Sequence, residues 1–301
     1  MYNPLDPPST DFNREHPPAS DIEPMVKAAL AEDVGDGDRT AALIDESTGA
    51  TATVVSRESA VLCGTAWFTA VFTEFDPAVK LTWLAKDGDY VRPDQELVRL
   101  EGPARSILTG ERTALNFLQL LSGTATQTRR FVDRVKGTKA KIVDTRKTLP
   151  GLRTAQKYAV RCGGGINHRF GLYDAVMVKE NHVATAGGLG AAIHQARMTY
   201  AKVPVIAEAE TIGDVEEALK CMAPPDILLL DDFETHLLAR AVNMVAQHSR
   251  HAHNKVLVEA SGGIDQSNVR DVADTGVDRI SIGGLTKNVT AVDLSMRFGG
   301  I

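Results

Sequence analysis

Cysteine is scarce in this chain, which contains three cysteines among 301 residues. Cys63, Cys162 and Cys221 are an odd number at wide spacing, so the sequence indicates neither a disulfide framework nor a zinc ribbon. A reducing compartment fits this pattern. We therefore expect a cytoplasmic protein whose three cysteines are structural.

Long apolar runs are missing as well. No stretch approaches the roughly 18 to 20 apolar residues that a membrane span requires. The first eighteen residues hold five prolines and no apolar stretch, which excludes the hydrophobic region of a signal peptide. We expect neither membrane insertion nor secretion, and we expect residues 1–20 to form a poorly ordered, proline-rich tail.

The chain also lacks an excess of positive charge. The chain has 33 Lys and Arg against 39 Asp and Glu, a net charge of −6 at pH 7. Affinity for a phosphate backbone needs a basic face, so a general nucleic-acid binder is excluded. Apolar residues make up 43% of the chain, which is ordinary for a globular protein with a sizeable core. A local cluster of basic residues therefore stands out.

The first part of the chain predicts a small domain. Residues 20–34 have a capping-type start and apolar residues at helical spacing. Residues 51–100 contain short β-rich runs separated by turn sequences. Residues 106–135 form a long helical stretch that leads into a second domain.

The second domain repeats a cycle of strand and helix. Six predicted strands have continuous apolar centres, as expected for parallel strands that are covered on both sides. They begin at Ala140, Asp174, Pro204, Asp226, Lys255 and Asp278. A closed or nearly closed barrel is the economical arrangement, and an open doubly wound sheet is the alternative. In either case we expect the chemistry at the carboxyl ends of the strands.

Residues 144–182 hold seven Lys or Arg and two His against three acids. This concentration of positive charge contrasts with the net negative charge of the whole chain. Arg146, Lys147 and Lys179 follow the ends of apolar strands, so we expect their side chains at the barrel mouth. The planar guanidinium of an arginine there matches a carboxylate with two hydrogen bonds. This cluster predicts a site for an anionic substrate.

A triple glycine at 163–165 precedes His168 and Arg169. Because glycine has no side chain, it allows a tight turn and a close approach of the backbone. We expect this turn to bring both side chains to the same site. A solvated basic helix face is the alternative for three other cations of the segment, Arg153, Lys157 and Arg161.

Paired glycines follow the last two predicted strands. Ser261, Gly262 and Gly263 follow the fifth strand, and Gly283 and Gly284 follow the sixth. Consecutive turns of this kind at the end of a barrel expose backbone N–H groups that bind a phosphate. Simple turns are the alternative for each pair taken singly.

Two carboxylates, Glu208 and Asp231, end the third and fourth strands. They could accept hydrogen bonds from ribose hydroxyls, coordinate Mg²⁺ or pair with a neighbouring lysine. Five histidines lack metal-ligand spacing near a carboxylate or thiol, and we assign them to the surface or the tail. They are His16, His236, His248, His251 and His253.

Eight motifs occur in a fixed order from about Ile22 to the end of the chain, and through them the chain resembles the quinolinate phosphoribosyltransferase family. They are ERTALNFLQLLSGTAT, DTRKTLPGLR, GGGINHR, VKENH, EAE, LLLDDF, EASGGI and GGLTKNV. The resemblance implies an α/β sandwich over residues 21–122 and an open α/β barrel of parallel strands over 123–287. It allows residues 288–301 to pack back on the sandwich. The proline-rich tail lies outside it.

The resemblance also implies roles for individual residues. Quinolinate would be bound by Arg112, Arg146, His168, Arg169 and Lys179. The phosphoribosyl pyrophosphate side would use Thr145, Lys147, Glu208 and Asp231, and the 5′-phosphate would lie on Ser261, Gly262, Gly263, Gly283 and Gly284. The catalytic residues would be Lys147, Lys179, Glu208 and Asp231. Lys287 stands where relatives often have His.

The implied enzyme is a pentosyltransferase that converts quinolinate and phosphoribosyl pyrophosphate into nicotinate mononucleotide, pyrophosphate and CO₂ in NAD biosynthesis. Mg²⁺ would be bound mainly through phosphoribosyl pyrophosphate, with Glu208 and Asp231 as the optional protein ligands. The assembly would be a homodimer, or a larger oligomer, whose subunits share their active sites. One alternative is a related barrel enzyme that uses another pyridine acceptor. The other is a biotinyl or lipoyl carrier module, which residues 86–102 resemble.

Overall fold

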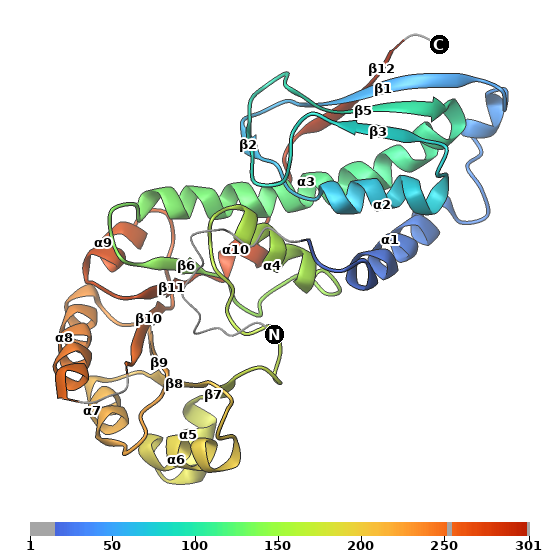
Figure 1. Cartoon of the computed structure of the whole chain (residues 1–301). Coiled ribbons are helices and arrows are strands. Elements are labelled where there is room, and N and C mark those ends of the chain that lie inside the picture. Colours follow the sequence, from blue (N-terminus) through green and yellow to red (C-terminus); the bar gives the residue numbers. More distant parts are fainter. Residues whose placement is uncertain (1–15, 252–254, 300–301) are drawn as a thin grey trace. The chain divides into compact units, whose positions relative to one another are not determined.

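The chain divides into two compact units, whose elements are labelled in Figure 1. The computed structural model describes residues 16–251 and 255–299. Within these ranges, the barrel unit comprises residues 130–147 and 165–284, and the sandwich unit comprises residues 16–129, 148–164 and 285–299. None of the described helices is long and apolar enough to cross a membrane.

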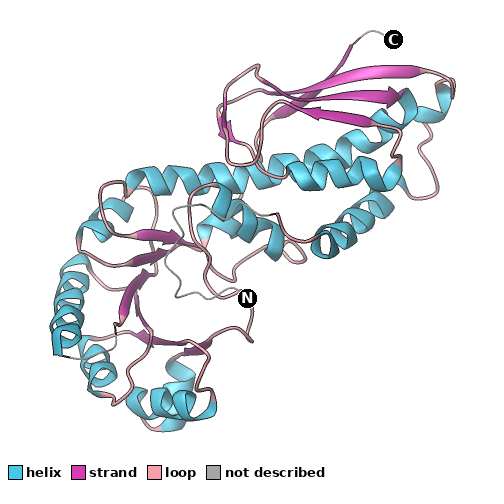
Figure 2. Ribbon diagram, viewed as in Figure 1, coloured by secondary structure: helices cyan, strands magenta, loops and turns pink. Residues whose placement is uncertain are grey.

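Six parallel strands form the sheet of the barrel unit, in the order β6-β11-β10-β9-β8-β7. They are β6 (Lys141–Val143), β7 (Val176–Val178), β8 (Val205–Ala209), β9 (Ile227–Asp231), β10 (Leu257–Ser261) and β11 (Arg279–Ser281). Strands β6 and β7 lie at the two edges, and Figure 2 shows the helices of this unit on the outer side of the curved sheet. The predicted open α/β barrel is confirmed.

Helices connect these strands. They are α5 (Glu180–Ala186) and α6 (Leu189–Thr199), followed by α7 (Ile212–Lys220), α8 (Thr235–His251) and α9 (Val269–Asp274). The start of α7 shows how the sequence sets a helix boundary, because the Thr211 hydroxyl accepts the backbone N–H of Asp214 at 3.2 Å. The Asp214 carboxylate in turn accepts the backbone N–H of Thr211 at 2.8 Å. This reciprocal capping satisfies two donors that the first turn leaves unpaired.

An antiparallel sheet of order β12-β1-β5-β3 forms one layer of the sandwich unit. Its strands are β1 (Gly49–Ser56), β3 (Lys80–Trp83), β5 (Glu96–Pro103) and β12 (Leu294–Gly299), and β2 (Ala60–Val61) pairs separately with β4 (Tyr90–Val91). The helical elements are α1 (Ala19–Val34), η1 (Ala41–Leu43), α2 (Thr65–Phe75), α3 (Ala104–Arg134), α4 (Arg153–Cys162) and α10 (Gly284–Lys287). Helices α2 and α3 run beneath the sheet in Figure 1. The last strand of the chain, β12, thus pairs with β1 in the sheet of the sandwich unit.

One boundary differs from the expected domain limits, since helix α4 belongs to the sandwich unit and not to the barrel. Tyr158 and Cys162 of α4 are buried in the apolar core of the sandwich unit. The approach to helix α3 is close, because a Cβ added at Gly163 would lie 2.4 Å from the carbonyl oxygen of Ala125. Glycine at this position is therefore a packing requirement of the sandwich unit.

Gly123, in the middle of α3, is also at a position where close packing leaves no room for a side chain. A Cβ there would lie 2.2 Å from the carbonyl oxygen of Thr290, so Gly123→Ala forces two backbone segments apart. We expect a loss of about 1–3 kcal/mol in the free energy of unfolding. The measurement is urea unfolding followed by tryptophan fluorescence, because both tryptophans, Trp67 and Trp83, lie in the sandwich unit.

Gly49→Ala is the matched control, since the nearest atom to its added Cβ is 4.0 Å away. We expect this variant to unfold within about 0.5 kcal/mol of the unmodified protein. Equal unfolding midpoints for the Gly123 and Gly49 variants would contradict the packing argument.

Candidate active site

The predicted site residues of the barrel unit follow the carboxyl ends of its parallel strands, which meet along one edge of the sheet. Thr145, Arg146 and Lys147 follow β6, and Lys179 follows β7. Glu208 and Asp231 lie at the ends of β8 and β9, and Asp231 is the register partner of Ser261 on β10. Arg112 is different, because it is an exposed residue of α3 in the sandwich unit.

Lys179 and Glu208 form an ion pair across the neighbouring strands β7 and β8. The Lys179 ammonium lies 2.7 Å from a carboxylate oxygen of Glu208. The Glu208 side chain is 7% exposed and that of Lys179 is 45% exposed, so the lysine still faces solvent. This pairing was one of the three roles that the sequence left open for Glu208.

Two further carboxylates join Glu208. Glu180, Glu208 and Glu210 each place a carboxylate oxygen within 4.8 Å of the others, and oxygen ligands of this kind suit Mg²⁺. Sequence analysis missed Glu180 and Glu210. The signal was present, because both residues stand in the motifs VKENH and EAE at strand ends.

Arg169 and Arg146 bring two positive charges close together. Burial lowers the pKa of Arg169, and the positive charge of Arg146 lowers it further, against the opposing effect of Asp174. One Arg169 nitrogen donates to the carbonyl oxygen of Ala175 at 2.9 Å, which fixes the guanidinium. Two guanidinium groups whose charges repel each other are stabilised by an anion that binds both. The geometry therefore favours a carboxylate-bearing substrate.

Asp144 anchors the turn that carries His168. It is fully buried, and its carboxylate accepts the backbone N–H of His168 at 2.8 Å and the Asn167 side-chain amide at 2.5 Å. The turn is also joined to β6 by a bridge between Val143 and Ile166. The triple glycine therefore leads into a rigid turn.

The ring of His168 faces protein groups on both sides. Its Nδ1 accepts the backbone N–H of Arg169 at 2.7 Å, and its Nε2 lies 3.4 Å from a carboxylate oxygen of Glu259. The side chain is 5% exposed. This arrangement assigns His168 a part in holding the Arg169 turn.

Glu259 and Arg279 form a buried ion pair inside the barrel unit. They are register partners on β10 and β11, and Arg279 Nε donates to a Glu259 oxygen at 2.7 Å. Burial acts to raise the pKa of Glu259, but His168 and Arg279, with hydrogen bonds from Ser281 and Arg279, lower it below its ordinary value. Sequence analysis named neither residue, because charged side chains within apolar strands gave no signal.

The paired glycines form turns in which a side chain would not fit. Gly262 and Gly263 have positive φ, 88° and 55°, and a Cβ on Gly262 would lie 2.1 Å from a carboxylate oxygen of Asp232. A Cβ on Gly283 would lie 3.0 Å from the Lys147 side chain and 3.7 Å from the Thr145 hydroxyl. The second glycine turn thus lies beside two residues that follow β6. Such a surface of backbone, hydroxyl and ammonium groups suits a phosphate.

The buried ion pair makes a prediction about stability. Glu259→Gln leaves the Arg279 charge without its carboxylate, so we expect the free energy of unfolding to fall by about 3–5 kcal/mol. Because the folded-state pKa of Glu259 is lowered, its contribution is present above the ordinary pKa of glutamate and is lost as the pH falls toward the folded value. The difference between the two proteins should therefore shrink on acidification, as measured by urea unfolding followed by circular dichroism.

Arg270→Met is the control, because it removes an ion pair with Asp274 in which both side chains are about half exposed. We expect a much smaller cost, because solvent screens an exposed ion pair. A Glu259→Gln cost as small as that of this control, or a difference that grows on acidification, would refute the assignment.

Comparison with known proteins gives a consistent result for both units. The family model described as quinolinate phosphoribosyl transferase, C-terminal domain, matches residues 124–297, and the corresponding N-terminal domain matches residues 38–122. A Synechocystis protein named probable nicotinate-nucleotide pyrophosphorylase [carboxylating] is 38% identical, with 93% of this chain and 94% of that protein covered. A Bacillus subtilis protein of the same name is 38% identical over 91% of this chain and 92% of its own.

A solved structure supports the same relationship. The structure of the nicotinate-nucleotide pyrophosphorylase from Francisella tularensis superimposes with a TM-score of 0.90 at 40% identity. The match covers 97% of this chain and 100% of that chain.

Proposed function

Since this chain belongs to the quinolinate phosphoribosyl transferase family, we propose that it transfers the phosphoribosyl group of phosphoribosyl pyrophosphate to quinolinate and releases CO₂. The products are nicotinate mononucleotide and pyrophosphate, which places the chain in de novo NAD biosynthesis. The observation that carries this proposal is the pair of neighbouring cations Arg146, which follows β6, and Arg169, in the turn after the triple glycine. Quinolinate has two adjacent carboxylates, and a pair of guanidinium groups complements that double charge.

Quinolinate binds between the cations that follow β6 and β7 and the turn of Arg169. Arg146 and Arg169 take its carboxylates, and Lys179 supplies a further positive charge from its partly exposed position. His168 contributes through the turn that it holds in place. Arg112, a residue of the sandwich unit, completes this set from a partner subunit.

The phosphoribosyl side occupies the remaining strand ends. The 5′-phosphate lies on the turns of Ser261–Gly263 and Gly283–Gly284, where glycine leaves the backbone accessible. Thr145 and Lys147, which lie beside Gly283, bind the same donor. Glu208 and Asp231 would contact the ribose or would offer hard oxygen ligands to Mg²⁺, and a bound Mg²⁺ would supply neutralisation of the negative charge of the pyrophosphate.

Charge development explains how this arrangement performs the reaction. As pyrophosphate departs, C1 of the ribose gains positive charge, and the pyridine nitrogen attacks it. The nitrogen then carries a positive charge, which stabilises the electron pair that is left on the adjacent ring carbon when the bond to the 2-carboxylate breaks. CO₂ leaves, and a proton from solvent replaces it on the ring carbon. No protein nucleophile is required, so the protein contributes orientation and electrostatics, worth up to roughly 7–11 kcal/mol for orientation.

We propose a homodimer with shared sites, in which Arg112 of one subunit serves the barrel unit of its partner. This residue comes from helix α3, whereas the other proposed ligands of quinolinate come from the barrel unit. We place the enzyme in the cytoplasm, in keeping with the three free cysteines, Cys63, Cys162 and Cys221.

The reaction can be tested by the order of its steps. Incubation with quinolinate, phosphoribosyl pyrophosphate and Mg²⁺ should give nicotinate mononucleotide, and quinolinate labelled in its 2-carboxyl group should release labelled CO₂ only when the phosphoribosyl donor is present. Nicotinate has one carboxylate less, and a cation left without its partner costs about 2–5 kcal/mol, or roughly 30-fold to several thousand-fold in turnover. Release of CO₂ without the donor, or equal turnover of nicotinate, would disprove this mechanism.

The shared site can be tested by subunit exchange. Arg112→Ala and Arg146→Ala should each be inactive alone. When the two proteins are mixed and allowed to exchange, some sites receive both arginines, so we expect part of the activity to return. No recovery despite exchange demonstrated with labelled subunits would show that one chain supplies both arginines.

A further inference from the structure

A second cluster of reactive side chains lies in the interior of the sandwich unit, apart from the residues proposed for the reaction. Cys63 follows β2, Asp87 lies between β3 and β4, and Cys162 ends α4. Their exposed fractions are 0%, 5% and 6%. The two sulfur atoms and a carboxylate oxygen all lie within 4.8 Å of one another. Three potential ligands of a transition metal, two thiols and a carboxylate, thus meet in the core.

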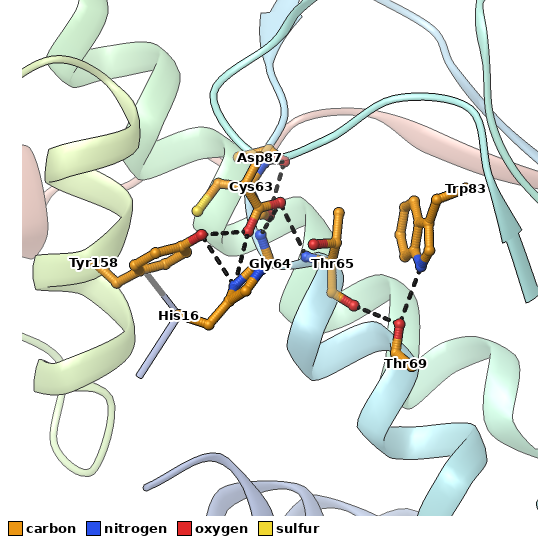
Figure 3. Close-up of polar contacts among 9 residues, drawn as sticks. His16, Cys63, Gly64, Thr65, Thr69, Trp83, Asp87 and Tyr158 are labelled. Carbon is orange, nitrogen blue, oxygen red and sulfur yellow. Dashed lines mark hydrogen bonds and ion pairs between the residues drawn. The ribbon is translucent and has the colours of Figure 1, made fainter. Parts of the chain in front are cut away.

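The Asp87 carboxylate is held in a fixed orientation. One oxygen accepts the backbone N–H groups of Gly64 and Thr65, both at 3.1 Å, and the other accepts the Tyr158 hydroxyl at 2.9 Å (Figure 3). A carboxylate oxygen has two lone pairs, so the oxygen bonded to Tyr158 retains one. Asp87 can therefore bind a metal ion while keeping all three hydrogen bonds.

The Cys63 thiol lies in an environment that disfavours its thiolate but would accept a cation. Burial raises the pKa of Cys63 most, the neighbouring Cys162 and Asp87 raise it further, and the positive charge of Arg161 opposes them. A divalent cation among these groups would reverse the effect of the neighbouring charges, because a coordinated thiol is deprotonated.

From this juxtaposition we propose that Cys63, Cys162 and Asp87 form a structural binding site for a divalent transition-metal ion of the Zn²⁺ type. Two thiolates and a carboxylate are typical zinc ligands, with ligand atoms about 3.5–3.8 Å apart when they are bound tetrahedrally. On binding, two S–H bonds break, two S–metal bonds form, and two protons pass to solvent. One divalent charge replaces two protons, so the net charge of the buried cluster stays the same.

His16 lies at the outer side of this cluster. Its Nδ1 is 3.1 Å from the Tyr158 hydroxyl oxygen and 3.8 Å from an Asp87 oxygen, and its side chain is 48% exposed. It also lines a pocket of about 450 Å³ with Thr65 and Trp83. Sequence analysis assigns His16 to the surface or the tail, and its exposed side chain agrees with that assignment, although the fold brings it close to Asp87. The residues come from four separate segments, so no spacing motif links them.

Metal binding would tie together three segments that are far apart in the sequence. Because the ligands come together in the folded chain, the free energy of binding adds to the free energy of folding. The ion would hold the end of α4 against the segment after β2 and the turn before β4. Its expected role is stabilisation of the sandwich unit.

The test uses the full chain, freed of metal with a chelator, kept reduced with a phosphine, and titrated with Co²⁺ and then with Zn²⁺. We expect thiolate-to-Co²⁺ charge-transfer absorption that saturates at one ion per chain and disappears when Zn²⁺ displaces Co²⁺. Cys63→Ser, Cys162→Ser and Asp87→Asn should each lower the affinity about tenfold or more. Cys221→Ser is the matched control, because this half-buried cysteine of the barrel unit should leave binding unchanged.

A second measurement does not depend on the folding of these variants. Calorimetry of the unmodified protein in buffers of different ionisation enthalpy should show about two protons released for each Zn²⁺ bound at neutral pH. Zn²⁺ should also raise the midpoint of thermal unfolding that tryptophan fluorescence reports. The proposal is overturned if Co²⁺ gives no thiolate absorption, if no protons are released, or if Cys221→Ser weakens binding as much as Cys63→Ser.

Discussion

The fold of the barrel unit depends on the pairing of two buried charges, Glu259 and Arg279. A charge in the interior is stabilised only by a partner in good geometry, and these two residues face each other at one register position of neighbouring parallel strands. The remaining Glu259 oxygen lies 3.4 Å from His168. The strand register, the buried pair and the imidazole therefore depend on one another. The backbone N–H of Arg169 donates to the same imidazole, so the position of Arg169 also depends on this arrangement.

The charged residues that follow the barrel strands are more exposed, or closer to a like charge, than the buried pair of Glu259 and Arg279. Glu259 is completely enclosed, whereas Lys179 is 45% exposed although it is paired with Glu208. Arg169 is buried close to the like charge of Arg146, so its guanidinium is in a less favourable environment than in water. The buried carboxylate of Glu259 thus has a cationic partner inside the barrel unit, whereas Lys179 and Arg169 are among the residues that we propose bind an anion.

The sequence allowed the strand ends and the glycine turns to be predicted, because both have local signals. Lys179 directly follows an apolar strand, and Gly262 adopts a positive φ that its turn requires. The anchors of the site had no such signal. Asp144 stands at the end of an apolar strand like any turn residue, and its role depends on a chain reversal that brings Asn167 and His168 to its carboxylate. Contacts of this kind are set by tertiary structure and have no periodicity.

The chain passes between the two units close in sequence to several of the predicted site residues. Lys147 and Gly284 are each the last residue of a barrel segment before the chain passes into the sandwich unit, and the turn of His168 begins soon after the chain returns at residue 165. The sandwich segment between Lys147 and that turn contains α4, which is fixed by the burial of Tyr158 in the sandwich core. Because the backbone is continuous, the packing of α4 in that core restrains the ends of the two barrel segments that flank it.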